Sequence, residues 1–66
     1  MGFTVKQARQ YAGFTQLEMA QKLGISRDTY RKIEKFPEDA TVATAKKISE
    51  VVGIPIDQIF FAKTST

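Results

Sequence analysis

The residues most capable of chemistry lie between positions 27 and 35. Four cations and one acid follow each other there at alternating spacings of one and three: Arg27, Asp28, Arg31, Lys32 and Lys35. On a helix, residues that are three or four positions apart lie on the same face. Guanidinium and ammonium groups bind phosphates and base acceptors, so this face suits an anionic partner. The alternative is a charged face that only meets solvent.

The positive charge of the chain is concentrated in its first half. The 66 residues hold 10 Lys and Arg against 7 Asp and Glu, a formal net charge of +3. Residues 1–35 contain seven of the cations and three of the acids, whereas residues 36–66 contain three and four. Such asymmetry indicates a nucleic acid or a membrane surface as the partner of one face.

The residue types that are missing exclude several kinds of site. The sequence has no Cys and no His, which excludes disulfides, zinc sites of the Cys/His type and a histidine general base. An enzyme would need a carboxylate pair or an activated Lys in a pocket, for which so short a chain has little room. We therefore expect no enzyme activity, no cofactor and no metal. Because no apolar run could span a bilayer, we also expect a cytoplasmic protein without a membrane partner.

Helix start and stop signals divide the chain into five short helices. Thr4, Thr15, Ser26 and Thr41 stand where N-caps are expected, and a Gly or Pro follows each long helix. The predicted helices cover about residues 5–12, 16–23, 27–35, 42–52 and 56–60. The expected fold is therefore all-α, with five short helices around one small core. We expect a single domain over residues 1–66, with a frayed tail at 63–66.

Apolar residues at spacings of three and four predict which side of each helix faces the core. They are Val5, Ala8, Met19, Ala20, Leu23, Tyr30, Ile33, Val42, Ala45, Ile48, Val52, Ile56, Ile59 and Phe60, with Phe14, Ile25 and Ile54 from the linkers. Only Gly24, Ile25 and Ser26 join helices 16–23 and 27–35, so these helices must cross steeply and closely. The small Ala20 and the turn-forming Gly24 meet these demands. Residues 16–35 therefore predict a helix-turn-helix.

At this point the chain resembles the lambda-type repressor and Cro group of helix-turn-helix regulators, also called the XRE family. The resemblance runs from about Val5 to Phe60 and rests on the joint spacing of Gln16, Met19, Ala20, Leu23, Gly24, Ile25, Ser26, Ile33 and Glu34. It implies a five-helix domain that dimerises on double-stranded operator DNA and lays helix 27–35 in the major groove. The DNA-binding residues expected on this basis are Gln16, Ser26, Arg27, Asp28, Arg31, Lys32, Lys35 and Thr41.

The resemblance also suggests individual roles for these residues. Positions that match Arg27, Asp28 and Lys32 touch base edges in similar proteins; Arg and Lys favour guanine, and Asp accepts from cytosine N4. Asp28 has an alternative role, in which it complements the helix dipole and pairs with Lys32. Gln16 would bind a phosphate from the start of its helix, or be a plain exposed residue. Ser26 serves first as a cap.

Glu34 requires a neutralising partner, because an acid in the last turn of helix 27–35 opposes both the helix dipole and the field of DNA. Arg9 is the candidate, since the family places a structural Arg-to-Glu bridge at the matching positions. We therefore expect Arg9 and Glu34 to form an ion pair beneath the surface, which would fix helix 27–35 to the first helix.

Two regions depart from the family pattern. The loop at residues 35–40 carries Glu38 and Asp39, which would repel phosphate, although Thr41 could still bind one. In the same loop, Phe36 is a candidate partner-facing aromatic. Tyr30 replaces a commoner aliphatic residue, and we expect it to pack in the core with its hydroxyl at the edge.

The last apolar residues bear on dimerisation. Phe60 and Phe61 are adjacent, so both cannot face the same core. We expect Phe60 inside and Phe61 exposed as a dimer contact; the alternative is that Phe61 folds over its own domain. A dimer sets two recognition helices about one DNA turn apart, roughly 34 Å, and predicts a near-palindromic operator.

The sequence thus predicts a sequence-specific, DNA-binding transcriptional regulator, most like a small phage or plasmid repressor of the Cro type, since no second domain follows. The alternative is a protein-interaction module on the same scaffold, such as an antitoxin-like or antirepressor-binding domain with a toxin or antirepressor as its partner. In that function Phe36 and Phe61 would matter more than the basic helix.

Overall fold

The structure is a computed structural model that describes residues 2–60. Four α-helices follow in order: α1 (Val5–Ala12), α2 (Gln16–Leu23), α3 (Arg27–Lys35) and α4 (Val42–Val52). Two 3₁₀ turns accompany them, η1 (Pro37–Asp39) after α3 and η2 (Ile56–Gln58) after α4. Residues 2–60 contain no strand, so the all-α fold class is confirmed. The bounds of the four long helices are those predicted from the sequence.

Each α-helix begins at the residue expected to cap it. The side chains of Thr4, Thr15, Ser26 and Thr41 accept a hydrogen bond from the backbone N–H three residues on. In α1 and α2 the third residue returns the bond, which completes a capping box at Gln7 and Glu18. These bonds satisfy N–H groups that a helix start otherwise leaves unpaired, so local sequence alone is enough to set where the helices start.

The fifth predicted helix is wrong in type. Within the predicted range, Ile56–Gln58 form the 3₁₀ turn η2, in which Gln58 N donates to Pro55 O and Ile59 N to Ile56 O, at 2.9 and 3.1 Å. Such i-to-i+3 bonds are usual in a segment of only one turn. The turn still carries Ile59 into the core, where its exposure is 5%.

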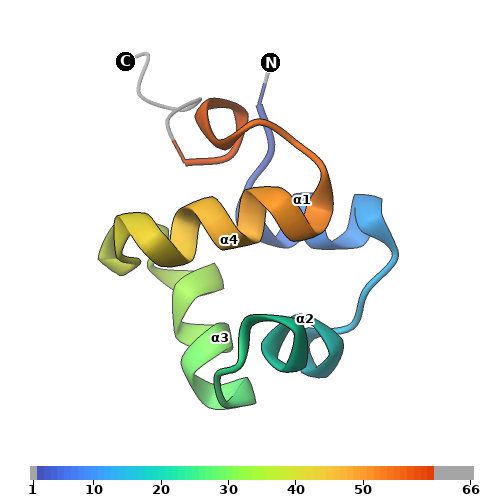
Figure 1. Ribbon diagram of the computed structural model, residues 1–66, viewed down its shortest axis with the longest axis vertical. Helices are drawn as coiled ribbons and strands as arrows, with labels where there is room; N and C mark the ends of the chain where they lie inside the picture. Colours follow the sequence, from blue (N-terminus) through green and yellow to red (C-terminus); the bar gives the residue numbers. More distant parts are fainter. Residues whose placement is uncertain (1, 61–66) are drawn as a thin grey trace.

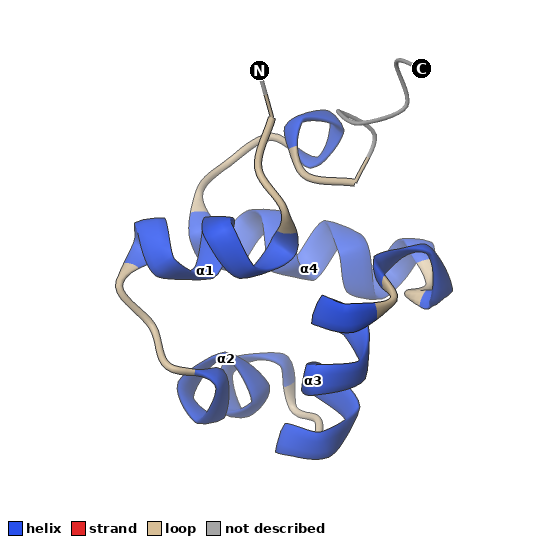
Figure 2. Ribbon diagram, turned by 180° about the vertical axis from the view of Figure 1, so that it is seen from behind, coloured by secondary structure: helices blue, strands red, loops and turns tan. Residues whose placement is uncertain are grey.

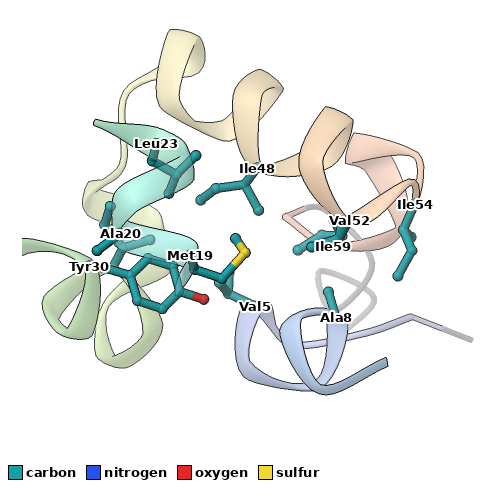
Figure 3. Close-up of a cluster of buried hydrophobic side chains, with 11 residues drawn as sticks. Val5, Ala8, Met19, Ala20, Leu23, Tyr30, Ile48, Val52, Ile54 and Ile59 are labelled. Carbon is teal, nitrogen blue, oxygen red and sulfur yellow. The ribbon is translucent and has the colours of Figure 1, made fainter. Parts of the chain in front are cut away.

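The helices are arranged around one apolar cluster. In Figure 1, α1 and α4 lie side by side across the middle, with α2 and α3 below them; Figure 2 shows the same arrangement from behind. The described chain begins and ends on the side away from α2 and α3, where Phe3 N donates to Gln58 O at 2.7 Å. Figure 3 shows the buried cluster, which contains Val5, Ala8, Met19, Ala20, Leu23, Tyr30, Ile33, Ile48, Val52, Ile54 and Ile59.

Most predicted core residues are buried, but Val42 is an exception. Its side chain is 75% exposed, and the first buried residue of α4 is Ala45. The spacing places Val42 on the inner face, yet its side chain lies mostly in solvent, so the prediction for this residue is wrong. Phe14, Ile25 and Phe60 are half-buried against the cluster. Within residues 2–60, no helix is long and apolar enough to cross a membrane.

A basic helix face and its buried anchor

The turn between α2 and α3 holds the two helices in close contact. Gly24 has a φ of 72°, and its N–H donates to the carbonyls of Ala20 and Gln21. L-amino acids with a side chain rarely adopt this left-handed conformation, whereas glycine does so readily. Ala20 is 1% exposed, as expected for a small residue at a close crossing. Ile25 N then donates to Ala20 O at 3.0 Å, and Ser26 begins α3.

Helix α3 separates its residues cleanly between two faces. Tyr30 and Ile33 are buried against the other helices. The opposite side is exposed and consists of Arg27, Asp28, Arg31, Lys32 and Lys35, which we call the basic face of α3. Four of its five side chains are cations, and Asp28, Arg31, Lys32 and Lys35 border a shallow hollow on it. This face can therefore attract and contact an extended anion.

Asp28 pairs with Arg31 and not with the Lys32 considered from the sequence. The distance between Asp28 Oδ1 and Arg31 Nη1 is 3.8 Å, and the two side chains are 82% and 59% exposed. A pair this open to solvent contributes little to stability. Asp28 also lies in the first turn of α3, where an acid complements the helix dipole.

The last turn of α3 is anchored by a partly buried ion pair. Arg9 Nε lies 2.6 Å from Glu34 Oε2, and the side chains are 11% and 7% exposed. Arg9 Nη1 also donates to Phe14 O at 2.9 Å, in the loop between α1 and α2. The structure thus joins the two residues that the sequence suggested as a pair, and it links α1 to α3 through them.

The second oxygen of Glu34 is bound by Gln16. Gln16 Nε2 donates to Glu34 Oε1 at 3.0 Å, from the first residue of α2. The sequence suggested either a phosphate contact or a plain exposed residue at this position. In the structure Gln16 is half-buried, and its amide connects α2 to α3. No local pattern predicted this bond, because it joins residues 18 positions apart.

The environment of Glu34 keeps it ionised. Burial alone would raise the pKa of its carboxyl, but the hydrogen bonds from Arg9 and Gln16, together with the charge of Arg9, outweigh burial and lower the pKa below its usual value. Burial likewise opposes the charge of Arg9, yet the hydrogen bond and the charge of Glu34 raise the pKa of the guanidinium. Both charges are therefore present at neutral pH.

Acid should weaken the ion pair of Arg9 and Glu34, and a comparison with a variant that lacks the Glu34 charge measures this effect. Because the pKa of Glu34 is lower in the folded protein than its ordinary 4.5, its contribution is complete above that value and is lost as the pH falls through the folded pKa. We expect Glu34→Gln to be less stable than wild type at about pH 7 and to approach wild type at about pH 3. Urea unfolding followed by circular dichroism measures the difference in the free energy of unfolding between wild type and the variant at each pH. Equal differences at the two pH values would contradict the prediction.

Tyr30 lies deeper than the sequence suggested. The residue is 0% exposed, and its ring points into the core beside Met19 and Val5 (Figure 3). The prediction that its hydroxyl lies at the edge is wrong, because the hydroxyl is buried too. Among residues 2–60 it has no hydrogen-bond partner. Burial, and then the neighbouring Glu34, raise the pKa of this hydroxyl well above its usual value.

Three of the remaining predicted residues lie at helix ends. Ser26 is a cap: its Oγ accepts from Thr29 N at 3.1 Å and donates to Thr29 Oγ1 at 2.9 Å. Thr41 is exposed and caps α4 in the same way, through Thr44. Phe36 is 46% exposed directly after α3. Phe61 lies outside the described residues.

Sequence reasoning missed one exposed residue on α3. Thr29 was not among the predicted DNA-binding residues, yet it is exposed and lies one turn before Lys32 on the same helix. Its hydroxyl is held by Ser26. The helical period used to place the basic residues would also have placed Thr29 at the border of that face.

Comparison with known proteins gives a consistent picture. A family model described as Helix-turn-helix matches residues 5–59. An uncharacterized HTH-type transcriptional regulator of Methanocaldococcus jannaschii is 39% identical over 56 residues, which are 85% of this chain and 85% of that protein. The HTH-type transcriptional regulator ImmR of Bacillus subtilis is 34% identical over 59 residues, 89% of this chain and 46% of ImmR.

A longer relative has a similar sequence identity to this chain, but the match covers a smaller part of that relative. The HTH-type transcriptional regulator RamB of Mycobacterium tuberculosis is 40% identical over 62 residues, 94% of this chain but 13% of RamB. The chain therefore spans most of the archaeal relative and less than half of ImmR and RamB. No solved structure matches the chain significantly.

Proposed function

Because the chain belongs to the XRE-type helix-turn-helix family of DNA-binding transcriptional regulators, we propose that it recognises a specific operator with α3 in the major groove. The observation that carries this proposal is the basic face of α3. It presents four exposed cations on the second helix of the motif, the helix that enters the groove in this arrangement. A face of this charge gains affinity by neutralising phosphates.

The residues of the basic face have different tasks in this proposal. Arg27 and Lys32 read base edges, where Arg and Lys favour guanine O6 and N7. Arg31 and Lys35 add charge toward the phosphates. Asp28 either accepts from cytosine N4 or, through its pair with Arg31, orients that side chain. The exposed position of all five residues supports these roles.

Helix starts supply the phosphate contacts. Gln16 opens α2 and Thr41 caps α4, and each stands beside backbone N–H groups that no helical carbonyl satisfies. Such groups, together with the helix dipole, favour a phosphate. Ser26 has the same position at α3. These contacts fix the position of the domain on DNA without reading its sequence.

We further propose that two copies act together, as in a small Cro-like phage or plasmid repressor. Helix α3 has 9 residues, so it is only about 14 Å long and covers roughly four base pairs. One such helix identifies too short a site to be selective, whereas two copies on a near-palindromic operator double the length that is read. Phe61 is the proposed dimer contact.

A salt titration followed by selection tests the function. We expect the affinity for random duplex DNA to fall steeply with salt, with a slope of about −0.9 for each phosphate neutralised. Selection from a randomised library should then enrich a short site with two-fold symmetry. Sedimentation of the complex with that site reports the number of copies bound. A salt-independent affinity with no enriched sequence would argue against DNA recognition.

One observation favours the interaction module as a second candidate. Phe36 is a large apolar residue that is 46% exposed beside a hollow bordered by Lys32, Ile33 and Asp39. An exposed aromatic side chain at a hollow is a usual anchor for a protein partner. This candidate predicts that Phe36→Ser leaves DNA affinity unchanged and abolishes binding to an antirepressor or toxin.

A further inference from the structure

Thr29 is an exposed residue of α3 whose side chain is held by the start of its own helix. Its Oγ1 accepts a hydrogen bond from Ser26 Oγ at 2.9 Å, and its backbone N–H donates to the same Ser26 oxygen at 3.1 Å. The backbone bond fixes Ser26, and Ser26 fixes the hydroxyl of Thr29, so the side chain is held in one rotamer. A side chain that is already ordered loses little entropy when a partner binds.

An open hollow lies beside this side chain, bordered by Thr29, Lys32, Ile33, Phe36 and Asp39. Thr29, Ile33 and Phe36 follow one another at spacings of four and three, so they form a row along one edge of α3. Ile33 and Phe36 have hydrocarbon side chains, and Thr29 carries a methyl group. The row therefore gives the hollow an apolar border.

The hollow adjoins the basic face of α3. Lys32 borders it and also borders the hollow on the basic face, so a molecule bound along that face lies next to both. The charge of Asp39 offsets that of Lys32 here, and the hollow beside Thr29 therefore attracts phosphate less than the basic face does. The group that fits this hollow best is an uncharged, apolar part of an otherwise anionic partner.

DNA displays one such group in its major groove. The bases present hydrogen-bond donors and acceptors there, and the C5-methyl of thymine is the one apolar group among them. In direct readout, threonine methyl groups and phenylalanine rings contact this methyl. The hollow beside Lys32 therefore matches thymine and no other base.

We propose that Thr29 is a specificity-determining residue whose methyl group contacts the C5-methyl of a thymine at this hollow. The inference rests on the proposed function, because it needs α3 in the major groove. Side chains three residues apart on a helix are about 5–6 Å from each other, and successive base pairs are about 3.4 Å apart. The thymine therefore lies within about two base pairs of the base that Lys32 reads.

Deoxyuridine tests this contact, because its base differs from thymine only in lacking the methyl group. Selection with Lys32→Ala identifies the base pair that Lys32 reads as the position where selectivity is lost, and the wild-type site should contain a thymine within about two base pairs of it. Deoxyuridine in place of this thymine in one half-site should weaken wild-type binding about fourfold, the effect of burying one small apolar group. Fluorescence anisotropy measures both affinities. A selected site without such a thymine, or equal affinities, would overturn the proposal and favour a protein partner for the hollow.

A conservative variant assigns the effect to Thr29. Thr29→Ser keeps the hydroxyl that bonds to Ser26 and removes the methyl group. Its affinities for the thymine and uridine operators should therefore agree within about twofold, because the two methyl groups act as a pair. A preference for thymine as large as that of wild type would overturn the role of Thr29.

The matched control is Thr44→Ser. Thr44 occupies the same position in α4, where its Oγ1 and backbone N–H bond to Thr41 as those of Thr29 bond to Ser26, and it does not border the hollow. This variant should keep the fourfold preference, and both variants should melt within about 4 °C of wild type. Loss of the preference in Thr44→Ser as well would overturn the assignment to Thr29. If wild type selects no operator, the proposed function fails together with this inference; if it selects one but does not distinguish thymine from uridine, only the role of Thr29 fails.

Discussion

Arg9→Ala should remove a large part of the stability of this fold. The variant strands Glu34, whose side chain is only 7% exposed, and removes the bond from Arg9 to Phe14 O. Removing one partner of a buried ion pair costs about 3–5 kcal/mol. A domain of this length has a total stability of roughly 3–10 kcal/mol, so the loss takes a large part of it. Urea unfolding followed by circular dichroism measures the free energy of unfolding directly.

The structure offers a matched control for this experiment. Arg31 also pairs with an acid, but at 3.8 Å and with both side chains open to solvent. Arg31→Ala should therefore change stability by less than about 1 kcal/mol. Replacing both partners, as in Arg9→Met with Glu34→Met, should recover much of the loss, because no charge is then left buried alone. An Arg9→Ala variant as stable as Arg31→Ala would show that the buried pair does not anchor α3.

The second large effect concerns DNA affinity. Arg27→Ala combined with Lys32→Ala should weaken binding to the selected operator by about 30-fold to 10⁴-fold. Each good base contact contributes about 1–3 kcal/mol of discrimination, and a factor of ten corresponds to about 1.4 kcal/mol. Stability should hardly change, because both side chains are exposed. Fluorescence anisotropy on the operator and on random DNA measures the specific and the non-specific affinity.

A second double variant, which removes the same number of positive charges from another helix, distinguishes the effect of where the charges lie from the effect of net charge. Lys46→Ala combined with Lys47→Ala removes the same two charges from exposed sites on α4, outside the basic face of α3. We expect its operator affinity to fall less than about threefold, because distant exposed charges are largely screened at physiological salt. Comparable losses from the two double variants would indicate that overall charge, and not the basic face, binds DNA.

The two predictions assign stability and recognition to opposite sides of α3. Its inner side contains Tyr30, Ile33 and the anchored Glu34, and its outer side is the basic face. Changes on the inner side should be seen first in unfolding, and changes on the outer side first in DNA affinity.

The sequence by itself determined the helices and the basic face. Caps such as Thr15 and turns such as Gly24 act within four residues, so the bounds of α1 to α4 follow from local chemistry. The outward position of Arg27, Arg31 and Lys35 follows from the helical period alone. The pair of Arg9 and Glu34 was suggested by family resemblance, because no local rule joins residues 25 positions apart.

Only the tertiary structure decided where the remaining polar and apolar groups are placed. It exposed Val42, buried the hydroxyl of Tyr30 and turned the amide of Gln16 to Glu34. Burial depends on which distant helices pack against a given turn, and a hydrogen bond across 18 residues depends on how those helices cross. Sequence periodicity gives the direction of a side chain around its own helix, but not what lies opposite to it.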